Sequence, residues 1–253
     1  MGEGGLVPDT FTPPTSYLSL LHALIEKGEF AASPLADRIV AYSGELANLR
    51  IDFERMKELH VGWWDMVHGF EEPDSARGLM RKKFLVTYTE DNAVIRIHAY
   101  RERVFQLTNA VLALGIPERN LKEKLSFTTL VTQALRERGQ VALLRHLESF
   151  TVEKPPAIKD SLERRNEFIH RIPTREWETL TSWAQLHDWL DYDRDKESFQ
   201  TKEPTDVQLE ADNLKRRWKW VDGFLDSLIE ELDIFEESFC RLLFEASLGG
   251  HVG

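Results

Sequence analysis

Arg165, Asn166 and His170 stand within a six-residue segment and could together bind an anion and exchange a proton beside it. A guanidinium keeps its positive charge at any working pH and holds oxyanions through two parallel hydrogen bonds. An imidazole changes its charge close to neutral pH, which suits it to proton transfer. The segment is therefore a candidate site, provided that its local structure brings the three side chains to one surface.

The candidate segment is predicted to lie on a helix over about 157–172, because prolines stand on both sides of this stretch. At about 100° per residue, Arg165 falls on an otherwise apolar arc. The apolar members of this arc are Ile158, Leu162, Ile169 and Ile172. Asn166 and His170 are four residues apart and share one edge of the arc. An arginine there can extend to solvent, pair with a buried carboxylate or line an anion pocket, and the pattern leaves all three readings open.

Further basic residues gather around the candidate segment in a chain that is otherwise acidic. Arg164 and Arg171 flank it, and Arg101 shares an arc with Ile97 and Val104 in a long helix predicted upstream. The formal net charge of -11 argues against nonspecific coating of nucleic acid, which needs a broadly basic surface. A local basic cluster is more informative in such a chain, and the arginines could converge on a phosphate.

Other catalytic and metal-binding patterns find little support. Glu167 and His170 have the Glu-x-x-His spacing of di-iron bundles, but such sites need a second copy of that motif and further glutamates. The single cysteine, Cys240, excludes an internal disulfide and a Cys-rich zinc site. No Gly-rich phosphate loop follows a strand, so we expect neither a metal nor a cofactor. The scattered histidines are interpreted as surface or satisfied core residues: His60, His68, His98, His146 and His187.

Apolar residues repeat with helical spacing through almost the whole chain, which predicts an all-α fold. The segment 84–88 is a short strand candidate with helical neighbours, and the highly charged segment 191–206 predicts an exposed loop. The predicted helices cover about 16–29, 33–59, 75–114, 127–147, 157–172, 176–190 and 207–248.

The last predicted helix carries an apolar seam whose members alternate four and three residues apart. They are Leu214, Trp218, Val221, Leu225, Leu228, Leu232, Phe235, Phe239 and Leu242. Such a seam is either core packing or a dimer interface. A lone helix cannot bury it, so we expect this helix to pack on the earlier ones.

The N-terminal residues 1–15 predict a flexible tail, because they are rich in Gly, Pro and Thr. They lack the basic start and apolar run of a signal peptide. No stretch approaches the roughly 18 to 20 apolar residues of a membrane span. We therefore expect a cytoplasmic protein without a membrane partner.

The candidate segment and its helical surroundings resemble the HEPN superfamily (higher eukaryotes and prokaryotes nucleotide-binding). The motif of that superfamily is an arginine, four to six residues and a histidine, often with Asn after the arginine. Arg165-Asn166-Glu167-Phe168-Ile169-His170 has this form, and Asn166 selects Arg165 over Arg164 as the motif arginine. Tyr100-Arg101-Glu102-Arg103-Val104-Phe105-Gln106-Leu107 resembles the basic-aromatic helix of several members.

The resemblance implies an all-α, elongated helical bundle of HEPN type with long helices. The HEPN-like bundle would cover 75–248, and an extra helical segment over 16–70 would be continuous with it in one domain.

The resemblance also implies a metal-independent endoribonuclease that serves as a toxin or in phage defence. His170 would act as general acid or base toward the 2'-hydroxyl or the leaving 5'-oxygen. Arg165 would bind the scissile phosphate and Asn166 would orient the histidine. The residues expected to bind the RNA substrate are Arg101, Arg164 and Arg171.

The partners implied by the resemblance are RNA, a second copy in a homodimer whose two motifs line one cleft, and an antitoxin or regulatory protein. The alternative is a non-catalytic helical module. Such a module would dimerise or bind a partner through the seam of the last helix.

Overall fold

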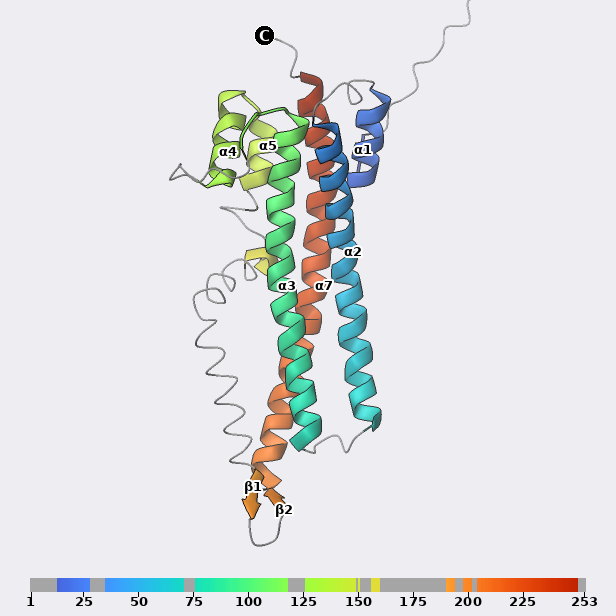
Figure 1. Cartoon of the computed structure of the whole chain (residues 1–253), viewed down its shortest axis with the longest axis vertical. Helices are drawn as coiled ribbons and strands as arrows, with labels where there is room; N and C mark the ends of the chain where they lie inside the picture. The colour runs from blue at the N-terminus through green and yellow to red at the C-terminus, as the bar shows by residue number, and fades with distance from the viewer. Residues whose placement is uncertain are drawn as a thin grey trace, which may run out of the picture. The chain divides into compact units, whose positions relative to one another are not determined.

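The computed structural model describes residues 13–27, 35–70, 76–117, 126–148, 150, 156–159, 190–193, 198–201 and 204–249. Its helices are α1 (Tyr17–Glu26), α2 (Ala36–Phe70), α3 (Ala76–Val111), α4 (Phe127–Glu137), α5 (Val141–Glu148) and α7 (Pro204–Gly249), drawn in Figure 1. The predicted all-α fold is confirmed. No helix in the described ranges combines the length and the apolar character that crossing a bilayer would need.

Helix α1 begins where the sequence predicts, but it buries a different face. The Ser16 hydroxyl accepts a hydrogen bond from the backbone N–H of Ser19, and the Ser19 hydroxyl accepts one in return from the N–H of Ser16. Helical spacing predicts an apolar stripe of Leu18, Leu21, Leu24 and Ile25, but Leu18 is 60% exposed. Tyr17 is fully buried instead, with its ring 6.1 Å from that of Phe239 on α7. Burying the larger aromatic ring therefore sets the rotation of this helix.

The long helices each contribute to two compact units. The first unit comprises the described residues up to Ala47, together with Arg103–Glu148 and those from Asp233 onward. The second comprises Asn48–Glu102 and the described residues of Ser149–Leu232. Helices α2, α3 and α7 therefore pass from one unit into the other within their own length.

The apolar seam of α7 is core packing. Leu225, Leu228 and Leu232 are fully buried in the second unit, and Phe239 is fully buried in the first. These side chains lose their solvent contact within a single chain, so they offer no surface to a partner. The expectation that a binding module would use this seam is therefore wrong, because the chain's own helices already cover it.

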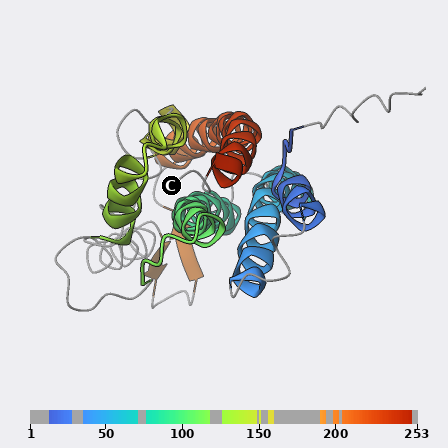
Figure 2. The same ribbon diagram turned by 90° about the horizontal axis from the view of Figure 1, so that it is seen from above.

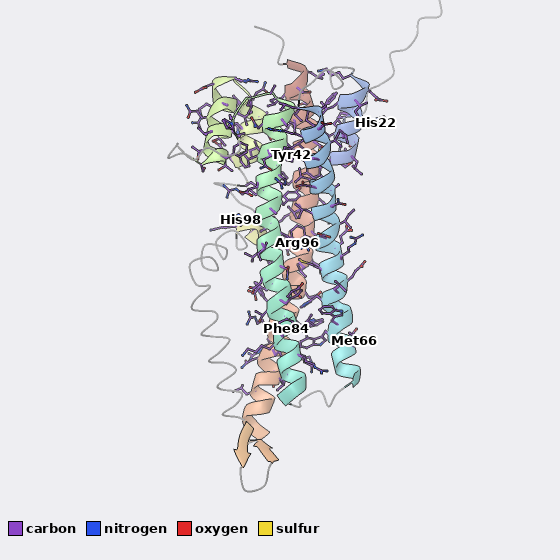
Figure 3. The ribbon with its side chains drawn as sticks, in the orientation of Figure 1. His22, Tyr42, Met66, Phe84, Arg96 and His98 are labelled. Carbon is purple, nitrogen blue, oxygen red and sulfur yellow. The ribbon has the colours of Figure 1, made fainter. Side chains whose placement is uncertain are left out.

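Within the second unit, polar contacts join the three long helices pairwise. Lys57 on α2 forms an ion pair with Asp226 on α7. Arg217 on α7 donates to Glu90 on α3 over 2.7 Å. Arg96 on α3 contacts α2 through Asp52, and Figure 3 shows the side chains along these helices. The apolar seam and these cross-helix pairs together fix the relative rotation of the helices in this unit.

The helix predicted over 127–147 is divided into α4 and α5. Gly139 separates them with a backbone φ of 69°, a conformation that residues with a side chain rarely adopt. Leu135 and Leu143, on either side of the turn, are both buried, so the helical spacing of apolar residues continues across it. For this reason the sequence pattern alone predicts one helix. Figure 2 shows the two short helices side by side.

The charged segment predicted as a loop over 191–206 contains a short antiparallel hairpin. Strands β1 (Leu190–Asp193) and β2 (Ser198–Thr201) pair with Tyr192 opposite Phe199. Apolar and polar residues alternate in β1, as strands require, and the high charge of the surrounding residues conceals this alternation. The strand candidate 84–88 is helical within α3 instead.

Candidate functional site

Most of the predicted site lies outside the described residues. This applies to the motif itself and to its flanking arginines: Arg164, Arg165, Asn166, His170 and Arg171. Their roles stay predictions. The structure does describe Arg101 and Pro156–Lys159, the stretch that leads into the motif from its N-terminal side.

The stretch that leads into the motif begins as a helix held by a carboxylate of α7. Residues 156–159 are helical, with a proline at the first position, where a missing N–H costs nothing. Glu231 Oε1 accepts a hydrogen bond from the Ala157 N–H over 3.1 Å, and Oε2 accepts one from the Ile158 N–H over 3.0 Å. The first N–H groups of a helix have no partner within the helix, and their partial positive charge favours an anion.

The arc predicted to face the core begins as expected. Ile158, the first apolar member of that arc, is fully buried, and Ala157 is also buried. Residues 156–159 are helical, in agreement with the helix predicted from about residue 157.

Arg101 lies half-buried on α3, next to fully buried apolar residues of the same arc. Ile97 and Val104 have no exposed surface, and the Nε atom of Arg101 has less than 1 Å² of accessible area. Arg101 therefore shares its side of α3 with buried apolar residues. Its contact with RNA stays a prediction.

The aromatic and basic side chains around Arg101 have structural partners. Tyr100 is fully buried with its ring 6.0 Å from that of Phe150, so it is no platform for stacking a base. Arg103 forms an ion pair with Glu45 and lies over the Tyr42 ring. Two residues of the basic-aromatic segment thus have structural roles: Tyr100 packs in the core, and Arg103 pairs with a carboxylate.

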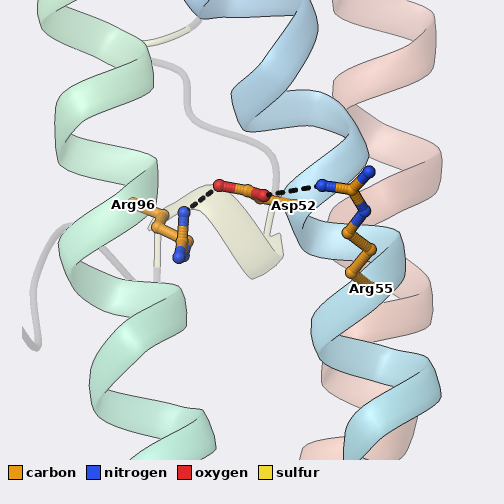
Figure 4. A network of polar contacts seen from close by, with 3 residues as sticks. All are labelled: Asp52, Arg55 and Arg96. Atoms are coloured by element: carbon orange, nitrogen blue, oxygen red, sulfur yellow. Dashed lines mark hydrogen bonds and ion pairs between the residues drawn. The ribbon is translucent and has the colours of Figure 1, made fainter.

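A second arginine of α3 is paired with a carboxylate in the same way. Arg96 donates to one oxygen of Asp52, and Arg55 lies 3.8 Å from the other oxygen, as Figure 4 shows. The carboxylate occupies the guanidinium edge on which a phosphate would otherwise bind. This cluster is accordingly an internal ion network that joins α2 to α3.

Two histidines are satisfied core residues, as predicted. His60 is fully buried between the Thr89 hydroxyl at 3.3 Å and the Trp218 carbonyl at 3.2 Å. His146 contacts the Phe235 carbonyl over 3.1 Å. Burial lowers the pKa of both imidazoles below their usual value. Both rings therefore stay neutral near pH 7 and serve as hydrogen-bonding core groups.

The thiol of the single cysteine is also unreactive in the folded protein. Cys240 is fully buried on α7, and burial, followed by the nearby charge of Glu236, raises the pKa of its thiol. A thiol is nucleophilic as its thiolate, so this residue is inert in the native protein. Within the described ranges, no three His, Cys, Asp or Glu side chains gather as a metal site would require.

Glu231 is the contact that the sequence does not reveal. It stands 74 residues from Ala157, and nothing in its neighbourhood distinguishes it from the other acidic residues of α7. The only signal is indirect. A Pro-Pro helix start next to a buried position requires an outside acceptor for its first N–H groups, but the sequence does not name that acceptor.

The long helices α2, α3 and α7 agree with an all-α protein of the HEPN type. Consistent with this, residues 74–239 match the family model of the Cthe2314-like HEPN domains. This match covers more than half of the chain, so the protein belongs to the Cthe2314-like HEPN family. No curated protein and no solved structure matches the chain significantly.

The matched range includes all of the predicted site residues, from Arg101 to Arg171. HEPN domains form a superfamily of nucleotide-binding and ribonuclease-like proteins. The division of the chain into a tail over 1–15, a segment over 16–70 and a bundle over 75–248 stays a prediction.

Proposed function

We propose that this protein is a metal-independent endoribonuclease whose active site is built from Arg165, Asn166 and His170. One observation carries the proposal: the complete Arg-Asn-x3-His motif lies inside the range that matches a HEPN family. The helical stretch at 156–159 supports it, because a helix that continued into the motif would bring Asn166 and His170, four residues apart, onto one side.

The chemistry follows from the three side chains. The ribose 2'-oxygen attacks the adjacent phosphorus while its proton passes to a base, and the bond to the 5'-oxygen breaks as that oxygen receives a proton. His170 serves one of these transfers, since imidazole titrates near working pH. Arg165 binds the phosphate oxygens and stabilises the charge that develops on them, while Asn166 orients the imidazole. The products are a 2',3'-cyclic phosphate and a 5'-hydroxyl.

RNA binding in a protein of net charge -11 depends on a local basic surface. We assign this surface to Arg101, Arg164 and Arg171. Arg164 and Arg171 flank the motif in the sequence, and Arg101 lies half-buried on α3. Arg96 and Arg103 are excluded from the assignment because carboxylates already hold them. A few phosphate contacts of this kind give moderate salt dependence.

The wider setting that we propose is a cytoplasmic toxin or phage-defence enzyme. It would act as a homodimer in which two copies of the motif line one cleft. An antitoxin or another regulatory protein would restrain its activity. These assignments rest on the resemblance to the HEPN superfamily.

The test is cleavage of RNA by the purified full-length chain in the presence of EDTA, with the product ends identified by mass spectrometry. We expect 2',3'-cyclic phosphate ends, and a His170→Ala variant should be slower by about 10²- to 10⁴-fold. His22→Ala is the matched control, because His22 is a solvent-exposed histidine on α1. Full activity of His170→Ala, or loss of activity on chelation, would contradict the proposal.

A further inference from the structure

The N-terminal part of α7 carries a basic cluster in a protein that is otherwise acidic. Lys215, Arg216, Arg217 and Lys219 stand within five residues. Farther along the same helix, residues 222–245 hold eight carboxylates and a single arginine. The charge of α7 is therefore strongly polarised along its length. An anionic ligand would be attracted to the basic cluster and repelled by the part of the helix that follows it.

Three of the four basic side chains are available to a ligand. Arg217 is set aside because it donates to Glu90. Lys215, Arg216 and Lys219 are exposed, and in the described part of the chain none of them pairs with a carboxylate. Arg216 donates only to a neutral side-chain amide one turn earlier, over 2.6 Å. These three cations can therefore bind an anion without first breaking an ion pair.

An aromatic ring lies beside the three cations. Trp220 is 41% exposed, and its ring stacks on that of Phe224 at 5.3 Å between centroids. Phe224 is buried, so this contact holds the indole in place at the surface. At roughly 100° per residue, positions 215, 216, 219 and 220 fall within an arc of about 140°. One face of α7 thus combines positive charge with an exposed aromatic side chain.

We propose that this face, formed by Lys215, Arg216, Lys219 and Trp220, binds single-stranded RNA. The inference rests on the proposed function and adds a substrate-binding surface to it. Surfaces that bind single strands combine cations that contact the phosphates with aromatic rings on which bases stack. In a duplex the bases are already stacked on one another, so Trp220 would gain no such contact.

The charge pattern favours a single strand over an anionic membrane. A membrane is a broad surface, and it would bring its negative charge against the carboxylates that follow in α7 as well as against the basic cluster. A single strand is narrow and flexible, so it can contact the basic face alone. The restricted size of the cluster therefore selects RNA as the ligand.

The test is fluorescence anisotropy of labelled oligouridine with the full chain carrying His170→Ala, which keeps the RNA intact, over a series of salt concentrations. In Lys215→Gln/Arg216→Gln/Lys219→Gln, the Kd at physiological salt should rise about 10- to 100-fold. The slope of log affinity against log salt should become shallower by about 2, since about 0.7 is lost with each phosphate contact.

The matched control is Arg136→Gln/Arg145→Gln/Arg241→Gln. It removes three exposed positive charges as well, but from the first unit. Its Kd should stay within about threefold of the parent, because salt screens charges that lie far from the bound strand. Equal Kd values in the two triple variants would overturn the proposed surface.

A Trp220→Ala variant separates stacking from charge. Its Kd should rise about 5- to 100-fold with an unchanged salt slope, because stacking on a base releases no counterions. Thermal unfolding checks that the variant is folded. A Kd equal to that of the parent would remove the stacking role.

Two further probes decide the class of ligand. Tighter binding of phosphatidylserine vesicles or of polyglutamate than of oligouridine would overturn RNA as the ligand. A wild type that cleaves RNA with a KM unaffected by the α7 triple variant would overturn this surface alone. A protein that binds RNA through this face without cleaving it would overturn the ribonuclease alone.

Discussion

Charged side chains that leave solvent in the second unit have compensating neighbours. Glu90 is 3% exposed and accepts from Arg217, while Lys82 is 3% exposed and lies over the Trp64 ring. A buried charge without a partner would cost several kcal/mol. These contacts therefore mainly offset the cost of burying the charges and add little net stability.

The Glu90–Arg217 pair gives a prediction at this scale. Arg217→Met should lower the free energy of unfolding by about 1–3 kcal/mol, because it leaves the buried carboxylate without its donor. Arg216→Met is the matched control: this neighbour is exposed and hydrogen-bonds only locally, to Asn213. Urea unfolding at pH 7.5 measures both variants. Equal stabilities of the two variants would show that Glu90 does not depend on Arg217.

At the scale of elements, two glycines have opposite roles. Gly139 ends the turn between α4 and α5 with a positive φ, whereas Gly223 lies in the interior of α7 with ordinary helical backbone. A Cβ atom at either position would meet nothing within 4 Å. Substitution by alanine therefore tests backbone conformation alone at both sites.

Gly139→Ala should destabilise the protein by about 1–2 kcal/mol, since alanine tolerates the left-handed conformation poorly. Gly223→Ala should instead stabilise it by about 0.5–1 kcal/mol, since alanine is the better helix former. Thermal unfolding followed by circular dichroism distinguishes the two signs. A stabilising Gly139→Ala would mean that α4 and α5 can join into the single helix that the sequence suggests.

These elements also show how far the sequence predicts the structure. The α7 seam and the Ser16 cap follow from spacing and local hydrogen-bonding chemistry, which act over a few residues. The break at Gly139 is hidden because the buried positions keep their period across it. The buried face of α1 depends on the distant ring of Phe239, and the N–H groups of Ala157 and Ile158 depend on Glu231. Spacing alone predicts the candidate motif but neither of these long-range contacts.

For the whole molecule, two of the described histidines, one in each compact unit, are kept neutral by burial or partial burial. His60 lies in the second unit and His146 in the first. The pKa of each is lowered by burial, while in the unfolded chain an imidazole titrates at about 6.5. Below that pH these histidines bind protons in the unfolded chain but stay neutral in the folded chain. The free energy of unfolding therefore falls as pH falls.

We therefore expect stability to decrease between pH 7.5 and 5.5, a window above the titration of most carboxylates. Each histidine contributes up to about 1 kcal/mol to this decrease. His60→Gln should reduce the pH dependence, whereas His22→Gln, at an exposed position, should leave it unchanged. Urea titrations at the two pH values give the comparison. A pH dependence identical in wild type and His60→Gln would show that this ring is not the titrating group.

The three long helices that pass between the units have a consequence for synthesis on the ribosome. Both units include part of α7, so neither is complete until the last helix has left the exit tunnel. Glu231 emerges more than 70 residues after Ala157, the residue whose N–H it accepts from. A nascent chain therefore exposes Ala157 and Ile158 without their acceptor, and both units can close only after the translating ribosome has passed the codons of α7.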